Sequence, residues 1–326
     1  MPETIGKRAF GTSGLRISEI GFGCGPTGGL MVSGSLTERC DVVSRAVAHG
    51  ITLFDTAPVY GDGRSESNLG ETLRALDAKV SVATKIVLEE GDLDDIRDAV
   101  RRSVETSLKR LRRDRVEILH LHNRVGWQRA PRPNIGVGAL LRVEDVMGPV
   151  AEAMQSLKRE GVVGAIGCCA FGGEMDAVRR VIDAGIYDGV LVNYSALNPS
   201  ALCDVPADVE PDYAKVGLAA AEKGMGIVAL RILEGGALAG AGAQYRNPAV
   251  LDRYLRNAPL EEGLRRAGMS LKEAATRFAL FDRRVSTALV GISNASQLDE
   301  IADFARRGPL APDLAPLLRA ALRDAA

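Results

Sequence analysis

The sequence has no surplus of charge of either sign, because 41 Lys and Arg residues face 42 Asp and Glu residues, for a net charge of −1. Such a chain has no overall positive field to attract a nucleic acid backbone or an anionic membrane. Long hydrophobic runs are also absent, since Gly, Arg or Asp interrupts each apolar stretch within about ten residues, well short of the ~20 that cross a bilayer. We therefore expect no nucleic acid partner and no membrane span.

Cysteine is scarce and irregularly spaced. The five cysteines are odd in number, show no CxxC spacing and follow no secretory signal. The two adjacent ones, Cys168 and Cys169, would face opposite sides of a strand, which disfavours a shared metal ion or a redox pair. The sequence thus predicts a reduced, cytoplasmic protein without a metal centre.

Glycine, in contrast, is abundant, at 36 of 326 residues, or about 11% against a usual ~7%, and predicts many tight turns. Hydrophobic residues make up 46% and charged residues 25%, an ordinary globular composition that supports a buried core. Length alone leaves one or two domains open, because an α/β barrel uses ~250 residues or more as a single unit.

Short β-rich runs alternate with amphipathic helical stretches along the chain. The predicted strands are 19–24, 52–57, 80–86, 116–122, 165–170, 189–194, 226–233 and 286–291, and the predicted helices are 36–49, 65–76, 93–112, 145–160, 173–184, 211–223, 270–281 and 296–306. These repeated βα pairs favour one closed (β/α)8 TIM barrel of the α/β class, a single domain over residues 1–326. Residues 7–18 predict an N-terminal β-hairpin, and residues 309–325 predict a C-terminal extra helix. Two longer segments, 123–144 and 234–269, follow strands and so belong to the carboxyl face of the barrel.

Residues 23–28 read G-x-G-x-x-G after a predicted strand, and Asp55 ends the next one, a pattern typical of Rossmann dinucleotide folds. That fold needs a helix to begin within the glycine motif, so that its amides meet the pyrophosphate. Residues 28–34 instead read as a loop, and the helix is expected to begin near Leu36. The glycines are better explained as letting backbone pass close to a ligand at the mouth of a barrel.

Ionisable groups end three successive predicted strands, at Asp55, Lys85 and His122. Neighbouring parallel strands lie ~4.8 Å apart, so these side chains can converge at the carboxyl rim, with Tyr60 reaching back from the following loop. Each residue also has a structural alternative: a buried ion pair for Asp55 and Lys85, a loop anchor for Tyr60 and a satisfied barrel histidine for His122. His120 lies ~6.6 Å deeper in the barrel and is expected to be a packing residue.

The motifs around these residues, in their joint order and spacing, resemble those of the aldo-keto reductases. The motifs are Phe54-Asp55-Thr56-Ala57, Tyr60-Gly61, Ser65-Glu66, Thr84-Lys85, Leu121-His122-Asn123, Ile166-Gly167, Asn198-Pro199, Gly235-Gly236-Ala237-Leu238 and Val290-Gly291. The resemblance covers nearly the whole chain. It implies a (β/α)8 barrel that binds a nicotinamide cofactor without a Rossmann domain, and an enzyme that reversibly reduces carbonyls to alcohols.

Reduction of a carbonyl by hydride leaves an alkoxide that needs a proton, and a free tyrosine with a pKa of ~10 is a reluctant acid. An ammonium within ~4–6 Å would stabilise the phenolate and lower the pKa of Tyr60, while Asp55 would keep Lys85 charged. A neutral His122 could hydrogen-bond the carbonyl oxygen and align it. We expect Asp55, Tyr60, Lys85 and His122 to be catalytic, with Tyr60 as proton donor in reduction and base in oxidation, and we expect Tyr60 and His122 to contact the substrate.

The implied cofactor cradle departs from the family pattern at three places. Cys168 and Cys169 stand where the family often has Ser-Asn to hold the nicotinamide carboxamide, and Leu230 or Arg231 stands where an aromatic residue stacks. The usual Lys and Arg of the adenosine 2′-phosphate site are missing after the eighth strand. The resemblance favours NADP(H), with NAD(H) as the alternative. The expected cofactor-binding residues are Gly23, Cys24, Asp55, Asn123, Cys169, Arg231, Leu233, Gly235, Ala237, Gly291, Ser293 and Gln297.

The 123–144 segment places Trp127, the one tryptophan of the chain, beside the four predicted catalytic residues, the tetrad of Asp55, Tyr60, Lys85 and His122. A flat aromatic face suits sugar rings, so Trp127 could line the substrate pocket, or it could anchor the loop. We expect a small-molecule aldehyde, ketone or sugar as substrate, and the sequence gives no indication of oligomeric state. Two rival hypotheses are a nucleotide-sensing auxiliary subunit with the same fold and little turnover, and a barrel aldolase or isomerase with Lys85 as a Schiff-base amine. Asp55 argues against the latter because it holds the lysine protonated.

Overall fold

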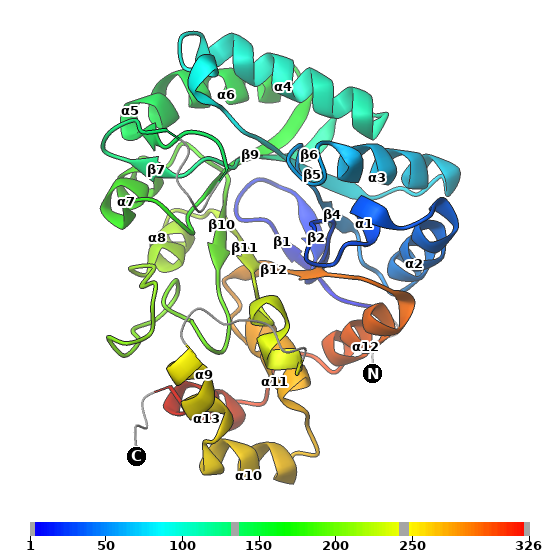
Figure 1. Ribbon diagram of the computed structural model, residues 1–326, viewed down its shortest axis with the longest axis vertical. Coiled ribbons are helices and arrows are strands. Elements are labelled where there is room, and N and C mark those ends of the chain that lie inside the picture. Colours follow the sequence, from blue (N-terminus) through cyan, green and yellow to red (C-terminus); the bar gives the residue numbers. More distant parts are fainter. Residues whose placement is uncertain (1–3, 132–136, 241–247, 323–326) are drawn as a thin grey trace.

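Eight parallel strands close into a barrel in the computed structural model, which describes residues 4–131, 137–240 and 248–322 (Figure 1). In chain order the strands are β3 (Ile20–Gly23), β4 (Leu53–Asp55), β5 (Ser81–Ile86), β6 (Val116–Leu121), β9 (Val163–Cys169), β10 (Gly189–Asn193), β11 (Gly226–Leu230) and β12 (Val285–Gly291). The last strand, β12, pairs with the first, β3, which closes the ring. The predicted (β/α)8 TIM barrel is therefore confirmed.

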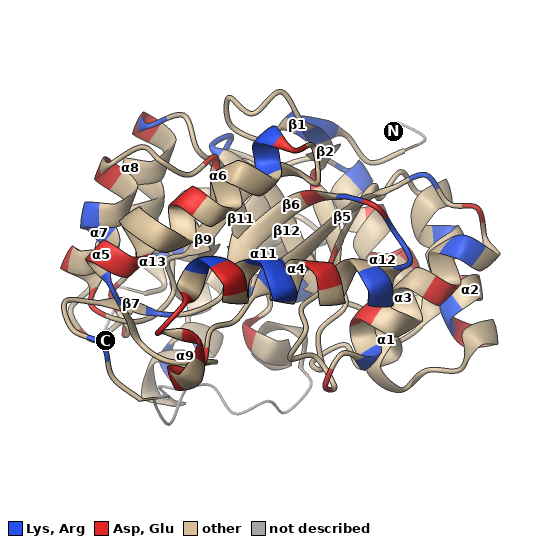
Figure 2. Ribbon diagram, turned by 90° about the horizontal axis from the view of Figure 1, so that it is seen from above, with Lys and Arg blue, Asp and Glu red and all other residues tan. Residues whose placement is uncertain are grey.

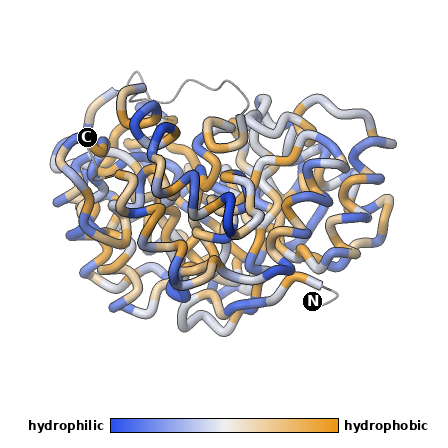
Figure 3. Tube along the Cα trace, turned by 90° about the horizontal axis from the view of Figure 1, so that it is seen from below, coloured by the Kyte–Doolittle hydropathy of each residue, from blue (hydrophilic) through white to orange (hydrophobic). Residues whose placement is uncertain are grey.

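Helices follow the strands and surround the barrel (Figure 1). They are α2 (Leu36–Ala48), α3 (Arg64–Ala75), α4 (Ile96–Leu111), α6 (Ala151–Arg159), α7 (Met175–Asp183), α8 (Val216–Glu222), α11 (Leu271–Phe281) and α12 (Ala295–Arg306). Lys, Arg, Asp and Glu lie on the outer faces of these helices, and the strands between them carry few charges (Figure 2). The hydropathy pattern agrees, with apolar segments concentrated inside the molecule (Figure 3). This distribution buries the apolar stripe of each helix against the outside of the barrel.

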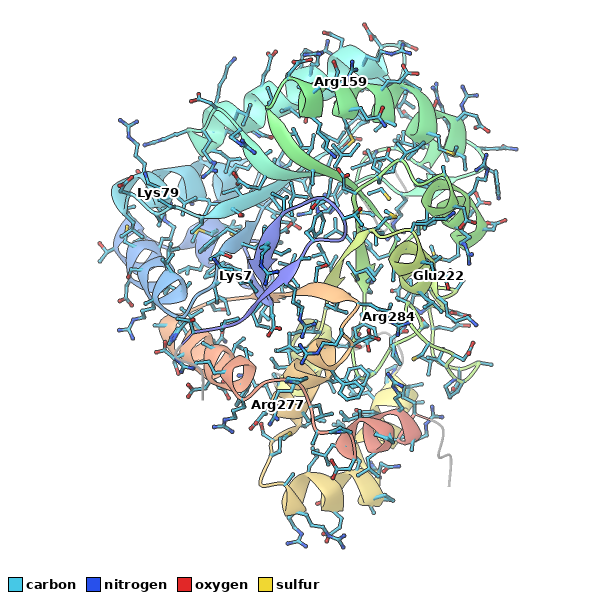
Figure 4. All side chains as sticks on the ribbon, turned by 180° about the vertical axis from the view of Figure 1, so that it is seen from behind. Lys7, Lys79, Arg159, Glu222, Arg277 and Arg284 are labelled. Carbon is cyan, nitrogen blue, oxygen red and sulfur yellow. The ribbon has the colours of Figure 1, made fainter. Side chains whose placement is uncertain are left out.

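The predicted hairpin closes the end of the barrel opposite the carboxyl rim. It consists of β1 (Lys7–Ala9) and β2 (Arg16–Ser18), and it crosses the barrel end in the view from behind (Figure 4). Phe10 and Ile17 are fully buried and belong to the hydrophobic cluster inside the barrel, with Leu53 and Ala83. Side chains of the described residues therefore fill this end, and the carboxyl rim is the open end of the barrel.

Additional elements lie outside the eight-fold repeat. Segment 123–144 contributes the short strands β7 (Val125–Gly126) and β8 (Leu141–Arg142), and α5 (Val143–Asp145) with η2 (Val146–Val150) leads into α6. The other additional helices are η1 (Glu90–Asp92), η3 (Glu234–Ala239), α9 (Pro248–Leu255), α10 (Ala258–Arg266) and α13 (Leu314–Ala320). The C-terminal helix is confirmed, although it is shorter than the predicted range 309–325, of which 323–325 lie outside the described residues.

The prediction of a loop over residues 28–34 is wrong. One helical turn, α1 (Leu30–Ser33), forms there, because Gly29 adopts a left-handed φ of 77° that redirects the chain and lets Leu30 and Met31 bury their side chains. The Rossmann interpretation nevertheless fails, since β3 belongs to a closed barrel. Within the described ranges, no helix is both long and apolar enough to cross a bilayer, and no cluster of three or more His, Cys, Asp or Glu side chains is arranged to hold a metal ion.

Candidate active site

Asp55, Tyr60, Lys85 and His122 meet at the carboxyl rim of the barrel. Asp55 ends β4, Lys85 is near the end of β5 and His122 directly follows β6. The Lys85 Nζ donates hydrogen bonds to Asp55 Oδ1 at 2.6 Å and to the Thr56 carbonyl at 2.7 Å. The same ammonium lies 5.0 Å from the centre of the Tyr60 ring. The predicted convergence of these residues is therefore observed.

His122 closes the other side of the group. Its ring centre is 6.1 Å from that of Tyr60 at an interplanar angle of 85°, so the two rings meet edge to face. On its far side His122 contacts Phe171, with ring centres 6.3 Å apart. The backbone N–H of His122 donates to the Ile86 carbonyl and extends the sheet by one residue, which fixes where the imidazole emerges. Sheet geometry and two aromatic contacts thus position the histidine beside the phenol.

The charges of the site are set by burial and by Lys85. Burial acts to lower the pKa of Lys85, but the charges of Asp55 and Tyr60 and the hydrogen bond to Asp55 outweigh it and raise that pKa above its usual value. The lysine is therefore an ammonium at neutral pH. Burial also raises the pKa of Tyr60, and the charge on Lys85 acts to lower it. The net shift for Tyr60 is upward, opposite to the lowering expected from the sequence, because the loss of solvation exceeds the effect of the lysine.

His120, within β6, and His122, directly after it, are both neutral at pH 7. Burial, followed by the charge on Lys85, holds the pKa of His122 well below its usual value. The same two causes lower the pKa of His120 to about 3. His120 is fully buried, and its ring meets Phe10 edge to face at 6.5 Å, in keeping with its predicted packing role. The site thus offers a neutral imidazole and a fixed ammonium to whatever oxygen lies next to Tyr60.

A groove of about 450 Å³ extends from Asp55 and Tyr60 to the beginning of α12. Eight of the expected cofactor-binding residues line it, namely Gly23, Asp55, Arg231, Leu233, Gly235, Gly291, Ser293 and Gln297. Gly25 also lines it, and a Cβ atom at that position would lie 3.5 Å from the Tyr60 ring. The absence of a side chain at Gly25 keeps the groove open beside the phenol.

The structure does not bring four expected cofactor-binding residues into this groove: Cys24, Asn123, Cys169 and Ala237 are not among its lining residues. Asn123 instead ties backbone together, since its amide donates to the Leu88 and Ala139 carbonyls and accepts from the Leu88 N–H. The thiols of Cys24 and Cys169 are buried, and burial raises the pKa of both. Cys169 packs in the barrel interior with Phe10 and Leu191.

Trp127 is also held away from the site. Its side chain is 45% exposed, its indole N–H donates to Asp176 Oδ2 at 2.9 Å, and its backbone N–H donates to Glu174 Oε1. These bonds attach the 123–144 segment to the start of α7. The loop-anchor interpretation of Trp127 fits this geometry.

Sequence reasoning missed residues on two sides of the tetrad. Lys272, on α11, lines the cofactor-sized groove near Gln297 and Ile301. A second pocket of about 650 Å³ begins at Phe171, and the groove and pocket share Leu230 and Arg231. Its polar lining residues are Arg124, Asn193, Asn198, Glu210, Asp212, Tyr213, Arg231 and Glu234. Asn193 could have been noticed because it ends a strand at the carboxyl rim, whereas no local pattern distinguishes Lys272 from a solvent-facing lysine.

Comparisons with known proteins agree with this architecture. The model of the aldo/keto reductase family matches residues 19–322. L-Galactose dehydrogenase from Arabidopsis thaliana is 31% identical over 301 residues, which are 90% of this chain and 86% of that protein. D-threo-Aldose 1-dehydrogenase from a Pseudomonas species is 28% identical, over 91% of this chain and 92% of that one. Among solved structures, the holo form of aldo-keto reductase AKR11C1 from Bacillus halodurans superposes with a TM-score of 0.74 at 21% identity, over 99% and 97% of the two chains, a likeness of fold.

Proposed function

The chain belongs to the aldo/keto reductase family, and we propose that it is an NAD(P)-dependent oxidoreductase that interconverts an alcohol and a carbonyl, with Tyr60 as the proton donor and acceptor. The observation that carries this proposal is the position of the Lys85 ammonium, 5.0 Å from the Tyr60 ring and bonded to Asp55. We also propose that the whole chain acts as one cytoplasmic domain. Its five cysteines are free, which is consistent with a reducing compartment.

Tyr60 needs help in both directions of the reaction. As an alcohol is oxidised, its hydroxyl proton must leave, and the phenolate of Tyr60 accepts it; as a carbonyl is reduced, the phenol returns that proton to the developing alkoxide. Burial disfavours the phenolate, and the Lys85 ammonium opposes this effect. Asp55 keeps the ammonium charged and in place, and the neutral His122 donates a hydrogen bond that holds the substrate oxygen beside the phenol.

The described groove fits a nicotinamide dinucleotide. Asp55 Oδ2 is buried and has no hydrogen-bond partner within the described structure, so a ribose hydroxyl at this end of the groove would satisfy it. Gly235 and Gly236 line the groove and adopt φ values of 65° and 106°, and we infer that this glycine turn presents backbone amides to the phosphate oxygens. When bound, the nicotinamide ring supplies the hydride acceptor or donor. Gly23, Gly235, Gly291 and Ser293 would hold the cofactor along the groove.

A hydroxylated, sugar-sized substrate fits the second pocket best. Arg124, Asn193, Asn198, Tyr213 and Glu234 line it with polar or charged side chains. Arg124 Nε is buried and has no hydrogen-bond partner among the described residues, so a substrate hydroxyl in this pocket would give it one. Two of the similar proteins are named as dehydrogenases of sugars, L-galactose and D-threo-aldose. We therefore propose that the substrate carbonyl or alcohol belongs to an aldose, oxidised or reduced at the carbon that lies next to Tyr60.

Turnover of a sugar panel with either dinucleotide tests this function. Purified protein is mixed with oxidised or reduced NAD or NADP and with aldoses and simple aldehydes, and the absorbance of the reduced cofactor is followed. Tyr60→Phe should lower kcat by about 10²- to 10⁴-fold while dinucleotide binding persists. Tyr254→Phe is the matched control, because it removes a buried hydroxyl with no hydrogen-bond partner among the described residues, on α9 and outside the groove. Dinucleotide binding without turnover across the panel would instead favour the nucleotide-sensing role, and turnover that survives Tyr60→Phe would refute the role of the phenol.

A further inference from the structure

The end of the groove beside α12, its far end, contains a cation that is already paired. Lys272 of α11 lines the groove there, and its ammonium forms an ion pair with the carboxylate of Glu300 on α12. The lysine side chain is 21% exposed and that of Glu300 43% exposed, so the pair sits at the edge of the groove between two packed helices. Arg231 and Lys272 are the two cationic residues among the described part of the lining, and Arg231 lies on the boundary with the substrate pocket.

The beginning of α12 is occupied by its own side chains. The Ser293 N–H donates to Gln297 Oε1 at 3.0 Å, and the Gln297 N–H donates to Asn294 Oδ1 at 3.0 Å. A phosphate that binds these two amides would have to displace both interactions, although amides at helix N-termini are usual phosphate donors. On the outer side of the helix, the Asp299 carboxylate bonds the Arg45 guanidinium and the His49 ring, so these groups are also engaged.

From this arrangement, and given the proposed function, we propose that the far end of the groove selects NAD(H) over NADP(H), and that Glu300 enforces the selection by holding Lys272. A bare ribose hydroxyl needs only hydrogen-bond partners, which Gln297 and Ser293 can provide after a small change of partner. A 2′-phosphate carries a charge of −1.5 to −2, and it could reach Lys272 only by approaching the Glu300 carboxylate. Glu300 is thus a positioning residue that acts through the lysine. This inference departs from the NADP(H) preference that the family resemblance suggested.

Paired probes that differ only in the 2′-phosphate isolate this effect. Calorimetric titration measures the affinities of 2′,5′-ADP against 5′-AMP and of NADPH against NADH for wild type, Glu300→Gln and the double variant Glu300→Gln with Lys272→Met. Wild type should bind 2′,5′-ADP no more tightly than 5′-AMP. Glu300→Gln should tighten 2′,5′-ADP by at least about tenfold and leave 5′-AMP within about twofold, because the freed ammonium gains a phosphate partner. The double variant should lose that gain.

Asp303→Asn is the matched control, since Asp303 lies one turn further along α12 and pairs with Arg306, outside the groove. It should leave both affinities unchanged. A merely structural role for Glu300 would shift the two mononucleotides equally, and that result would overturn the inference, as would wild-type protein that prefers 2′,5′-ADP or NADPH by tenfold or more. If wild-type protein binds neither NADH nor NADPH, the proposed function itself fails and takes the inference with it.

Discussion

The ammonium of Lys85 lies over the ring of Tyr60, 5.0 Å from its centre, in a site where the lysine is 2% exposed. Placing a charge there costs desolvation free energy, which Asp55 offsets through a 2.6 Å hydrogen bond from Lys85 Nζ. The pair is thus a buried ion pair whose stabilisation depends on both partners. Stability and proton transfer are consequently linked through one lysine.

Lys85→Met should destabilise the protein by about 3–5 kcal/mol at pH 7, because it leaves the Asp55 carboxylate buried without its counter-charge. The double variant Asp55→Asn with Lys85→Met should be clearly more stable than Lys85→Met alone, since it removes the uncompensated charge. Urea unfolding of Lys85→Met, of Asp55→Asn and of the double variant measures the coupling free energy between the two residues.

Lys79→Met provides the exposed counterpart of that experiment. Lys79 also forms an ion pair, with Asp77, but the two side chains are 84% and 87% exposed. Its removal should change the unfolding free energy little, because solvent screens the pair. Equal losses at Lys85 and Lys79, or strict additivity for Asp55 and Lys85, would contradict the interpretation of the buried pair.

The ends of the barrel strands were the most predictable part of the site. Asp55, Lys85 and His122 each follow a short buried apolar run, and parallel strands bring such ends to one rim. The net direction of the pKa shift of Tyr60 was not predictable from these positions. It depends on how much solvent the folded chain removes from the phenol, which no local pattern encodes.

Contacts between distant segments fix the positions that the sequence left open or did not indicate. Trp127 follows the tetrad closely in the chain, but Asp176, on α7, holds its indole. Asn123 directly follows His122, yet Leu88 and Ala139 occupy its amide. Lys272 enters the groove because α11 packs beside α12, a relation that neither helix shows alone.

Acid should weaken the protein through His120. The pKa of its imidazole is lowered to about 3 by burial and then by Lys85, while the unfolded chain titrates near the ordinary value of ~6.5. Below pH ~6.5 His120 therefore binds a proton in the unfolded state and stays neutral in the folded state. As a result, the free energy of unfolding falls by up to about 1.4 kcal/mol per pH unit until the pH nears 3. Above pH ~6.5 the residue adds no pH dependence.

His120→Leu should remove that contribution. Between pH 7 and pH 5, wild type should lose about 2 kcal/mol more unfolding free energy than the variant, as measured by urea titrations at each pH. The slope is the readout, because the leucine also changes packing against Phe10 and so shifts the absolute stability. Parallel stability curves for the two proteins would show that His120 titrates normally.

Trp127→Phe should leave kcat/KM within about threefold of wild type, because the indole is bonded to Asp176 and lines neither the groove nor the substrate pocket. Phe171→Ala should raise KM at least about tenfold, since Phe171 lines the pocket and contacts His122. Steady-state kinetics with the best substrate of the panel compares the two variants. The reverse ranking would place the tryptophan, and not the phenylalanine, against the substrate.

At the closed end of the barrel, Phe10 and Gly189 lie far apart in the chain but pack against each other. Gly189 begins β10, and a Cβ atom there would lie 2.1 Å from Cζ of the fully buried Phe10. Gly189→Ala should therefore cost about 1–3 kcal/mol of unfolding free energy through overpacking, and Phe10→Leu should cost a similar amount by leaving a gap. Combined, the two changes should cost less than their sum, because the smaller side chain vacates the space that the new methyl group needs.

Urea unfolding of the double-mutant cycle decides this, with Gly91→Ala as control. A Cβ atom at Gly91, in η1, meets no atom within 4 Å, so this variant should change stability by less than about 0.5 kcal/mol. Additive losses for Phe10 and Gly189 would mean that the hairpin moves away from the barrel end instead of repacking. The tetrad lies at the opposite rim of the barrel, so activity per folded molecule should stay unchanged in all of these variants. Packing at the closed end would then affect stability without affecting catalysis.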